Sequence, residues 1–427
     1  MRKIIKPVFI LVFIVAHVFI LRNIILLSKD VIYGDLSGNA LVPFPRYGLV
    51  RIPNTPAAQQ YQAQNHLEVD FAQIYFPSQQ MAALSENYRT GFLDPLQRPS
   101  RYAPLLHYLC SITICKLDYG IASLLHIAIQ GLLFYAVFVF SFKVLKIEKY
   151  IFFGLLLANA YLFLTPAGLS WFERGQFSVY IGIGYLLMLL GFIKKNSLLV
   201  LLSILFAFIK WTSFPYILVV LCVYILNSNS LVDGKKAVLL SGACLLIVIF
   251  LCLLFPDQSL NFLKGLYDQE RFGLPGGISL TNFLPVWMVK FLPIPLIILG
   301  YMHVKINHNV IERSIPFLAG AAIIMLTYPT MAFEYNLPSL LGFIPLIIYW
   351  VKLPNNPIKA PVRKVMKYSF LAFVFFASSS SYIKTPRGGI VLSEYLIISL
   401  ILIIVPLFYY WIGTRCPNQP DEKLAQY

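Results

Sequence analysis

A carboxylate among aromatic residues is the first group in this chain whose surroundings could support chemistry. Asp70 lies in VDFAQIYFP (residues 69–77), within a polar stretch from Ser28 to Ala103. On a helix, Phe71, Ile74 and Tyr75 would pack along one stripe and hold the carboxylate at its edge. Burial raises the pKa of a carboxyl group and a nearby cation lowers it, so either can prepare it for proton transfer. A solvated Asp at a helix end is the open alternative.

A lysine interrupts an apolar run farther along the chain. Lys210 follows Phe206 to Ile209 and precedes Trp211. Ionisable groups are costly in lipid and often mark functional sites. An ammonium at headgroup depth suits a phosphate, because it is a compact charge with three donors. The alternative is a lysine that extends its charge to an interface.

Three further polar segments lie between apolar ones. Residues 173–176 combine Glu173, Arg174 and Gln176. Arg174 could hold a phosphate or pair with Glu173, and Gln176 could bind a sugar, while a plain loop is the alternative. Arg271, in the segment from 257 to 282, is a second possible anion contact, and Glu334 opens a third cluster.

Histidines and cysteines carry no metal or hydrolase signature. The 6 histidines include no H-E-x-x-H spacing, and no G-x-S-x-G elbow occurs. The 6 cysteines lack zinc-site spacing, and we interpret Cys110 and Cys115 as small buried hydrophobic side chains. We predict no metal ligands and no firmly implied cofactor, although a divalent cation remains open.

Composition indicates a membrane protein. Of 427 residues, 59% are hydrophobic and 12% charged, against about 25% charged in soluble proteins. The net charge of +16 is typical of loops that face anionic headgroups. Because no basic stretch is interleaved with aromatic residues, we expect membrane lipids as partners and no nucleic acid.

Apolar windows predict about twelve membrane-spanning segments. The first, residues 7–27, follows three basic residues and lacks a small-residue cleavage site, so we interpret it as an uncleaved anchor. The others lie near 118–140, 150–168, 176–193, 197–210, 213–226, 236–255, 283–302, 313–331, 336–351, 367–383 and 390–411.

Basic residues predict the orientation of these segments. With the amino terminus inside, lysines fall in the inner loops and most of the 18 acids on the outer face. We expect a multi-pass protein of the inner (plasma) membrane, with both termini cytoplasmic and the site on the periplasmic or external face. Residues 197–226, between two inner basic loops, are too short for two full crossings. We therefore predict a short membrane hairpin that turns near Lys210.

Together these residues resemble the GT-C membrane glycosyltransferases, particularly family 87, which includes polyprenyl-phosphate-mannose-dependent mannosyltransferases. Val69-Asp70-Phe71, with Tyr75 following, matches the Asp of that family's long first external loop, and residues 101–105 match its aromatic-proline ending. Gly175-Gln176 matches a pair in the second external loop. Lys210 to Pro215 resembles a Lys-Pro element, although the family more often has Pro directly after Lys. Glu334-Tyr335 stands where the family has a His-Tyr pair.

The resemblance implies a hexosyl or pentosyl transferase with an inverting mechanism. Asp70 would be the catalytic base, and a polyprenyl-phosphate-linked sugar donor would transfer its sugar to a lipid or cell-envelope glycan acceptor. Cationic side chains would bind the donor phosphate, and polar or aromatic ones the rest of the substrates. The implied phosphate-binding residues are Lys210, Arg174 and Arg271, and the implied substrate-binding residues are Tyr75, Arg101, Tyr102, Glu173, Gln176 and Glu334.

The sequence as a whole predicts an all-α polytopic membrane protein, residues 1–427 forming a single GT-C-like unit. A long external loop, residues 28–103, follows the first helix and carries Asp70 on amphipathic helices. Two alternatives remain: a multi-pass transporter or flippase, and a polysaccharide polymerase acting on lipid-linked glycans. The absence of an internal repeat argues against the transporter, and a polymerase would have its largest external loop later in the chain.

Overall fold

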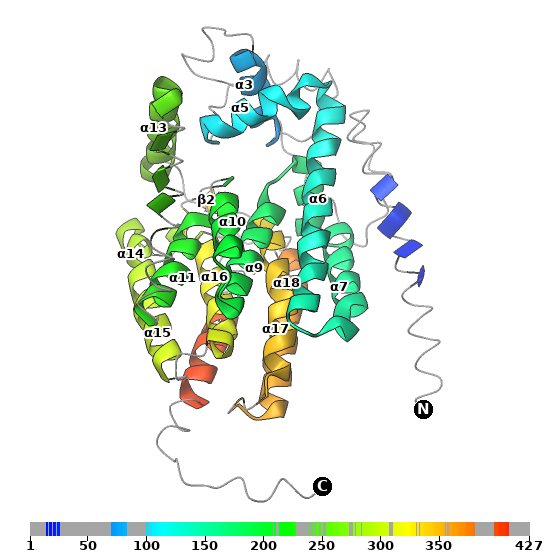
Figure 1. Ribbon diagram of the computed structural model, residues 1–427, viewed down its shortest axis with the longest axis vertical. Helices are drawn as coiled ribbons and strands as arrows, with labels where there is room; N and C mark the ends of the chain where they lie inside the picture. The colour runs from blue at the N-terminus through cyan, green and yellow to red at the C-terminus, as the bar shows by residue number, and fades with distance from the viewer. Residues whose placement is uncertain are drawn as a thin grey trace, which may run out of the picture.

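The computed structural model shows a bundle of α-helices (Figure 1). The described residues are 70–82, 100, 102–207, 209–210, 213–227, 253–272, 276–277, 279–282, 284–306, 311–329, 331–332, 334–354, 356, 358–380 and 397–409, with isolated helical residues between 14 and 25 and between 239 and 250.

The predicted all-α class is confirmed. The α-helices are α3 (Ala72–Ala82), α5 (Pro104–Ile112), α6 (Tyr119–Val144), α7 (Ile151–Leu164), α8 (Pro166–Arg174), α9 (Ser178–Lys194), α10 (Ser197–Ala207), α11 (Phe214–Asn227), α13 (Pro256–Phe272), α14 (Val286–Phe291), α15 (Pro293–Ile306), α16 (Ile315–Leu326), α17 (Phe343–Lys352) and α18 (Ala360–Ser380). Short 3-10 helices connect them: η1 (Ile114–Lys116), η2 (Glu148–Tyr150), η4 (Leu280–Asn282), η5 (Ile311–Ser314) and η6 (Glu334–Gly342). Strands β1 (Gly276–Gly277) and β2 (Met331–Ala332) form one short parallel pair.

Two described helical stretches, Tyr119–Val144 and Val286–Ile306, are long and apolar enough to cross a membrane. Only 33% and 22% of their most apolar windows are buried, and Leu132 of α6 is 70% exposed. Such exposed apolar surface favours association with lipid over the core of a soluble protein. The other apolar helices in the described part have 10–17 residues, so the predicted count of about twelve full spans is not confirmed. A run of apolar residues does not show where a helix ends, as at Thr165, where α7 ends and α8 begins within one predicted segment.

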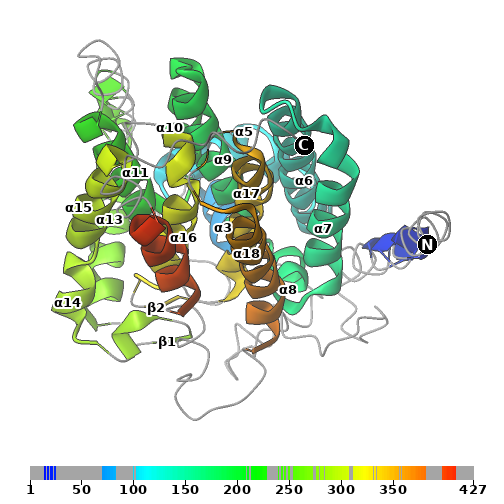
Figure 2. The ribbon, with the colours of Figure 1, turned by 90° about the horizontal axis from the view of Figure 1, so that it is seen from below.

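Helix α9 lies at the centre of the fold. Its residues from Ser178 to Phe192 are nearly all buried, and it packs against α6, α10 and η6. Seen from below, α9, α16 and α17 lie between α11 and α15 on one side and α6 and α7 on the other (Figure 2). A Cβ atom on Gly342 would overlap the carbonyl oxygen of Gly182. Glycine at these two positions therefore allows η6 to approach α9 closely.

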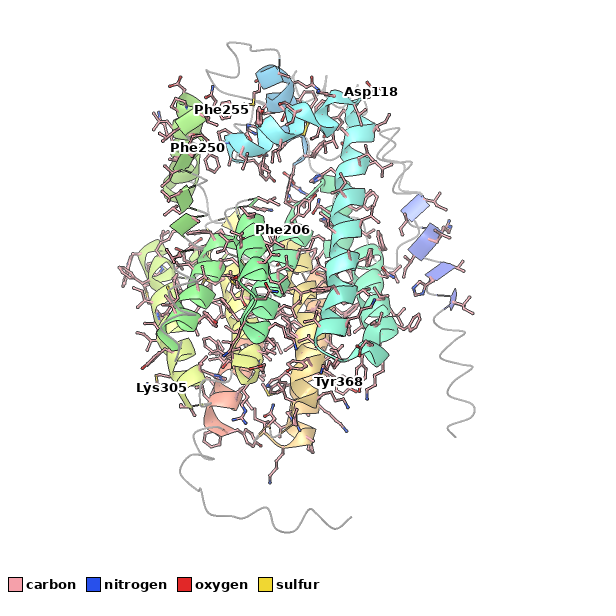
Figure 3. The ribbon with its side chains drawn as sticks, viewed as in Figure 1. Asp118, Phe206, Phe250, Phe255, Lys305 and Tyr368 are labelled. Atoms are coloured by element: carbon pink, nitrogen blue, oxygen red, sulfur yellow. A yellow bond between two sulfur atoms is a disulfide. The ribbon has the colours of Figure 1, made fainter. Side chains whose placement is uncertain are left out.

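Helices α3 and α5 pack together at one end of the bundle. Asp118 lies at this end, whereas Lys305 and Tyr368 lie at the opposite end (Figure 3). A disulfide joins Cys110 to Cys115. Both cysteines are buried, as expected, but the interpretation as free hydrophobic side chains is wrong. Spacing alone did not reveal the bond, because the turn at Thr113 brings the two residues together.

The predicted hairpin around Lys210 has two helical arms, α10 and α11, which end and begin at Ala207 and Phe214. The arms contact different neighbours: α10 packs mainly against α9, and α11 mainly against α15. Lys210 therefore lies on a connection whose two flanking helices pack against different parts of the bundle. On the α10 side, the ring of Phe206 lies 5.8 Å from the ring of Tyr180 of α9.

Candidate functional site

Asp70 is fixed directly before α3 by its neighbours. Its backbone N–H donates to the carbonyl oxygen of Arg174 at 3.0 Å. The next residue, Phe71, is 1% exposed, and its ring stacks on His126 of α6 at 4.7 Å. The predicted aromatic stripe thus anchors the start of α3 to α6, and the Asp70 side chain is only 10% exposed.

The end of α8 presents two polar side chains to Asp70. Gly175 has a left-handed backbone with φ 62°. Its N–H donates to the carbonyl of Phe172, and the N–H of Gln176 donates to that of Trp171, which together form a Schellman motif. Glycine adopts this conformation without steric cost. The turn separates Arg174, the last residue of α8, from Gln176, so both side chains reach one carboxylate.

One carboxylate oxygen receives donors from both residues. Arg174 Nε donates to Asp70 Oδ2 at 2.6 Å, and the Gln176 side-chain amide donates to the same oxygen. An ionised carboxylate only accepts hydrogen bonds, and bonds to a guanidinium are among the stronger ones. The sequence left open whether Arg174 pairs with Glu173; in the structure Arg174 pairs with Asp70.

Lys210 joins this cluster through the other end of the same amide. Its Nζ donates to Gln176 Oε1 at 2.7 Å and to Asn336 Oδ1 at 3.0 Å. Asn336 belongs to η6 and is 4% exposed. The hydroxyl of Ser213 donates to the Lys210 carbonyl at 2.8 Å, which holds the connection between α10 and α11. Four segments far apart in sequence therefore bring a carboxylate and two cations together.

The remaining predicted site residues divide into those whose side chains the structure describes, Tyr75 and Tyr102, and those whose side chains lie outside the described part. Tyr75 turns toward η1, where its hydroxyl donates to the Leu117 carbonyl at 2.8 Å, and burial raises its pKa. The ring of Tyr102 packs 4.7 Å from that of Phe177, the residue after Gln176. Arg101 lies outside the described residues. Glu173, Arg271 and Glu334 have helical backbones, but their side chains lie outside the described part.

Sequence reasoning missed a supporting layer beneath the cluster. Gln130 of α6 donates to the Gln176 carbonyl at 2.9 Å, and the indole of Trp171 donates to Gln130 Oε1 at 3.3 Å. His126 contacts the Gln130 amide at 2.9 Å. The available signal was an amide and an imidazole one helical turn apart in a mostly apolar helix. Asn336 belongs to the polar segment that Glu334 opens.

Among the described residues, no group of three or more His, Cys, Asp and Glu side chains could hold a metal ion. The arrangement is instead a carboxylate held by two donors and an ammonium held by two amides. Such a set can accept a proton at Asp70 and stabilise negative charge at Lys210. Comparisons with protein-family models, curated protein sequences and solved structures found no match to this chain.

Proposed function

We propose that the chain is a membrane glycosyltransferase that moves a sugar from a polyprenyl-phosphate-linked donor to a lipid or glycan acceptor. The observation that carries the proposal is the single amide of Gln176, which donates to Asp70 and accepts from Lys210. A proton acceptor and a phosphate-binding cation are thereby held one side chain apart. The lipid-linked donor follows from the resemblance of the Asp70, Gly175-Gln176 and Lys210 segments to GT-C enzymes.

The chemistry requires both groups. Asp70 takes the proton of an acceptor hydroxyl, and the oxygen of that hydroxyl attacks the anomeric carbon of the donor sugar. The bond from that carbon to the phosphate oxygen breaks, and its electron pair leaves with the polyprenyl phosphate. Lys210 and Arg174 stabilise the charge that develops there. Attack opposite the leaving phosphate inverts the anomeric carbon.

We place this reaction on the outer face of the inner (plasma) membrane, in a multi-pass bundle with cytoplasmic termini. Two observations support that orientation. The disulfide Cys110–Cys115 lies in the layer that carries Asp70, and disulfides persist in oxidising compartments such as the periplasm. At the opposite end lie Lys305 and Tyr368 of α18 (Figure 3), and the turns of α18 that precede Tyr368 carry Arg363 and Lys364, as the positive-inside rule expects for the cytoplasmic side.

Purified protein in vesicles with a polyprenyl-phosphate-linked sugar and a lipid acceptor tests the proposal. We expect covalent transfer, and Asp70→Asn should lower its rate by roughly 10²- to 10⁴-fold. Asp118→Asn is a matched control, because Asp118 begins α6 at the same end without a side-chain cap bond. Full activity of Asp70→Asn would disprove the base assignment. Movement of lipid-linked substrate across the bilayer without transfer would favour a flippase, and extension of a glycan by repeated units a polymerase.

A further inference from the structure

Beneath the candidate site, α6 carries two buried polar residues to which the proposed reaction assigns no role. Gln130 is 0% and His126 4% exposed, and they lie one turn apart on a helix whose residues are mostly apolar. Burying an amide or imidazole costs free energy unless every polar atom is bonded. Their hydrogen bonds converge on the turn that holds Arg174 and Gln176.

Both the nitrogen and the oxygen of the Gln130 side-chain amide form hydrogen bonds. Nε2 donates to the Gln176 carbonyl at 2.9 Å and lies 2.9 Å from His126 Nε2. Oε1 accepts from Trp171 of α8. With both amide hydrogens used as donors, His126 Nε2 must be the acceptor, which places the ring hydrogen on Nδ1.

His126 also binds the turn formed by Gly175 and Gln176. Its ring also hydrogen-bonds to the Gly175 backbone. The same ring packs 4.7 Å from Phe71, which follows Asp70, and 4.4 Å from Phe177, which follows Gln176. One imidazole therefore contacts both segments whose side chains meet at the carboxylate.

We propose that Gln130 and His126 are positioning residues that fix the 175–176 turn, and through Gln176 align Asp70 with Lys210. The effect on activity rests on the proposed function, whereas the geometric effect does not. Neither residue touches the Asp70 carboxylate in the bonds described here. Both act through backbone carbonyls, which a substitution of Gln176 itself leaves in place.

A geometric test needs no assay of transfer. In an Asp70→Cys/Gln176→Cys variant, we expect a short bifunctional thiol reagent to cross-link the pair readily. Adding Gln130→Met, an apolar side chain of similar length, should slow cross-linking roughly tenfold, because the turn loses its donor. Ser123→Ala is the matched control, since that hydroxyl bonds only within α6 to the Tyr119 carbonyl among the bonds described. Unchanged cross-linking in folded Gln130→Met would overturn the proposal.

Kinetics supply the second test. Gln130→Met should lower kcat roughly 10- to 100-fold with little change in KM for the donor. In a Gln176→Ala background it should add little further loss, because its effect passes through that side chain. Additive losses would overturn the proposal.

A second variant covers the case in which Gln130→Met does not fold. His126→Phe keeps the ring contacts with Phe71 and Phe177 and removes both ring nitrogens, so the same cross-linking and kinetic results are expected. If the wild-type protein shows no transfer, the proposed function fails while the cross-linking result still decides whether α6 positions the turn.

Discussion

The Lys210 ammonium donates to the Gln176 side-chain oxygen at 2.7 Å. The nitrogen of that amide donates to Asp70, so a neutral side chain connects the cation to the carboxylate. Arg174 makes the direct ion pair with Asp70, and Lys210 reaches the acid through this amide. The amide therefore fixes the ammonium of Lys210 close to the carboxylate of Asp70.

Replacing Lys210 by Met should reduce transfer strongly. The substitution removes the ammonium that donates to Gln176 and Asn336, and loss of one such electrostatic group costs roughly 10²- to 10³-fold in kcat. Lys210→Arg should recover part of the rate, because the charge remains but its shape differs. Lys116→Met, an exposed lysine of η1, is the control. Equal rates for wild type and Lys210→Met would rule out a role in leaving-group stabilisation.

Replacing Gly175 by Ala should cost both stability and activity. An L residue in the left-handed conformation, φ 62° here, costs roughly 1–2 kcal/mol. Relaxation of that strain would also turn Arg174 and Gln176 away from a shared carboxylate. The comparison is Gly131→Ala, where a Cβ atom meets nothing within 4 Å and helix propensity improves by about 1 kcal/mol. Denaturation in detergent should show opposite shifts for the two variants.

The charged members of the candidate site could be identified from sequence because charge among apolar residues is conspicuous. Asp70 and Lys210 each interrupt aromatic and aliphatic neighbours, and Arg174 shares a short polar segment with Gln176. Their meeting could not be derived, because residues 106 positions apart, such as Asp70 and Gln176, share no local pattern. The neutral amides Asn336 and Gln130 carry no such signal, although they hold the cluster in place.

The fold class followed from composition, whereas helix lengths did not. Helix α10 has only 11 residues, and it packs mainly on α9 and much less on α11. Which neighbour a helix contacts depends on close approaches such as Gly182 with Gly342. A hydropathy window averages over these positions and gives no information on them.

The Cys110–Cys115 disulfide should stabilise the docking of α3. The carbonyl of Cys115 accepts from the Gln79 side chain, and Tyr75 donates to Leu117 in the same turn. Closing so short a loop contributes roughly 2 kcal/mol in the chain-entropy account. Cys110→Ala/Cys115→Ala should therefore increase hydrogen exchange in α3 and leave α9 unchanged. Cys222→Ala, which replaces a free cysteine of α11, controls for loss of a thiol, and equal exchange in α3 for all three proteins would contradict this role.

Acid should loosen the same end of the molecule through His107. Its Nε2 lies 2.8 Å from the hydroxyl of Ser100, it bonds to the Gln73 backbone, and burial lowers its pKa to about 3. The unfolded chain takes up a proton near pH 6.5, whereas the folded protein does not. Stability from this residue is therefore complete above pH 6.5 and is lost as pH falls toward 3, by about 1.4 kcal/mol per pH unit.

His107→Gln measures this contribution directly, because glutamine has no titrating group in that range. The free energy of unfolding, determined between pH 7 and pH 5, should fall by about 2 kcal/mol more for the wild type than for the variant. At pH 7 the wild type should be the more stable of the two, since it keeps the bonds to Ser100 and Gln73. Parallel pH dependences for the two proteins would mean that His107 has the same pKa in the folded and unfolded chain, and that another group accounts for any sensitivity to acid.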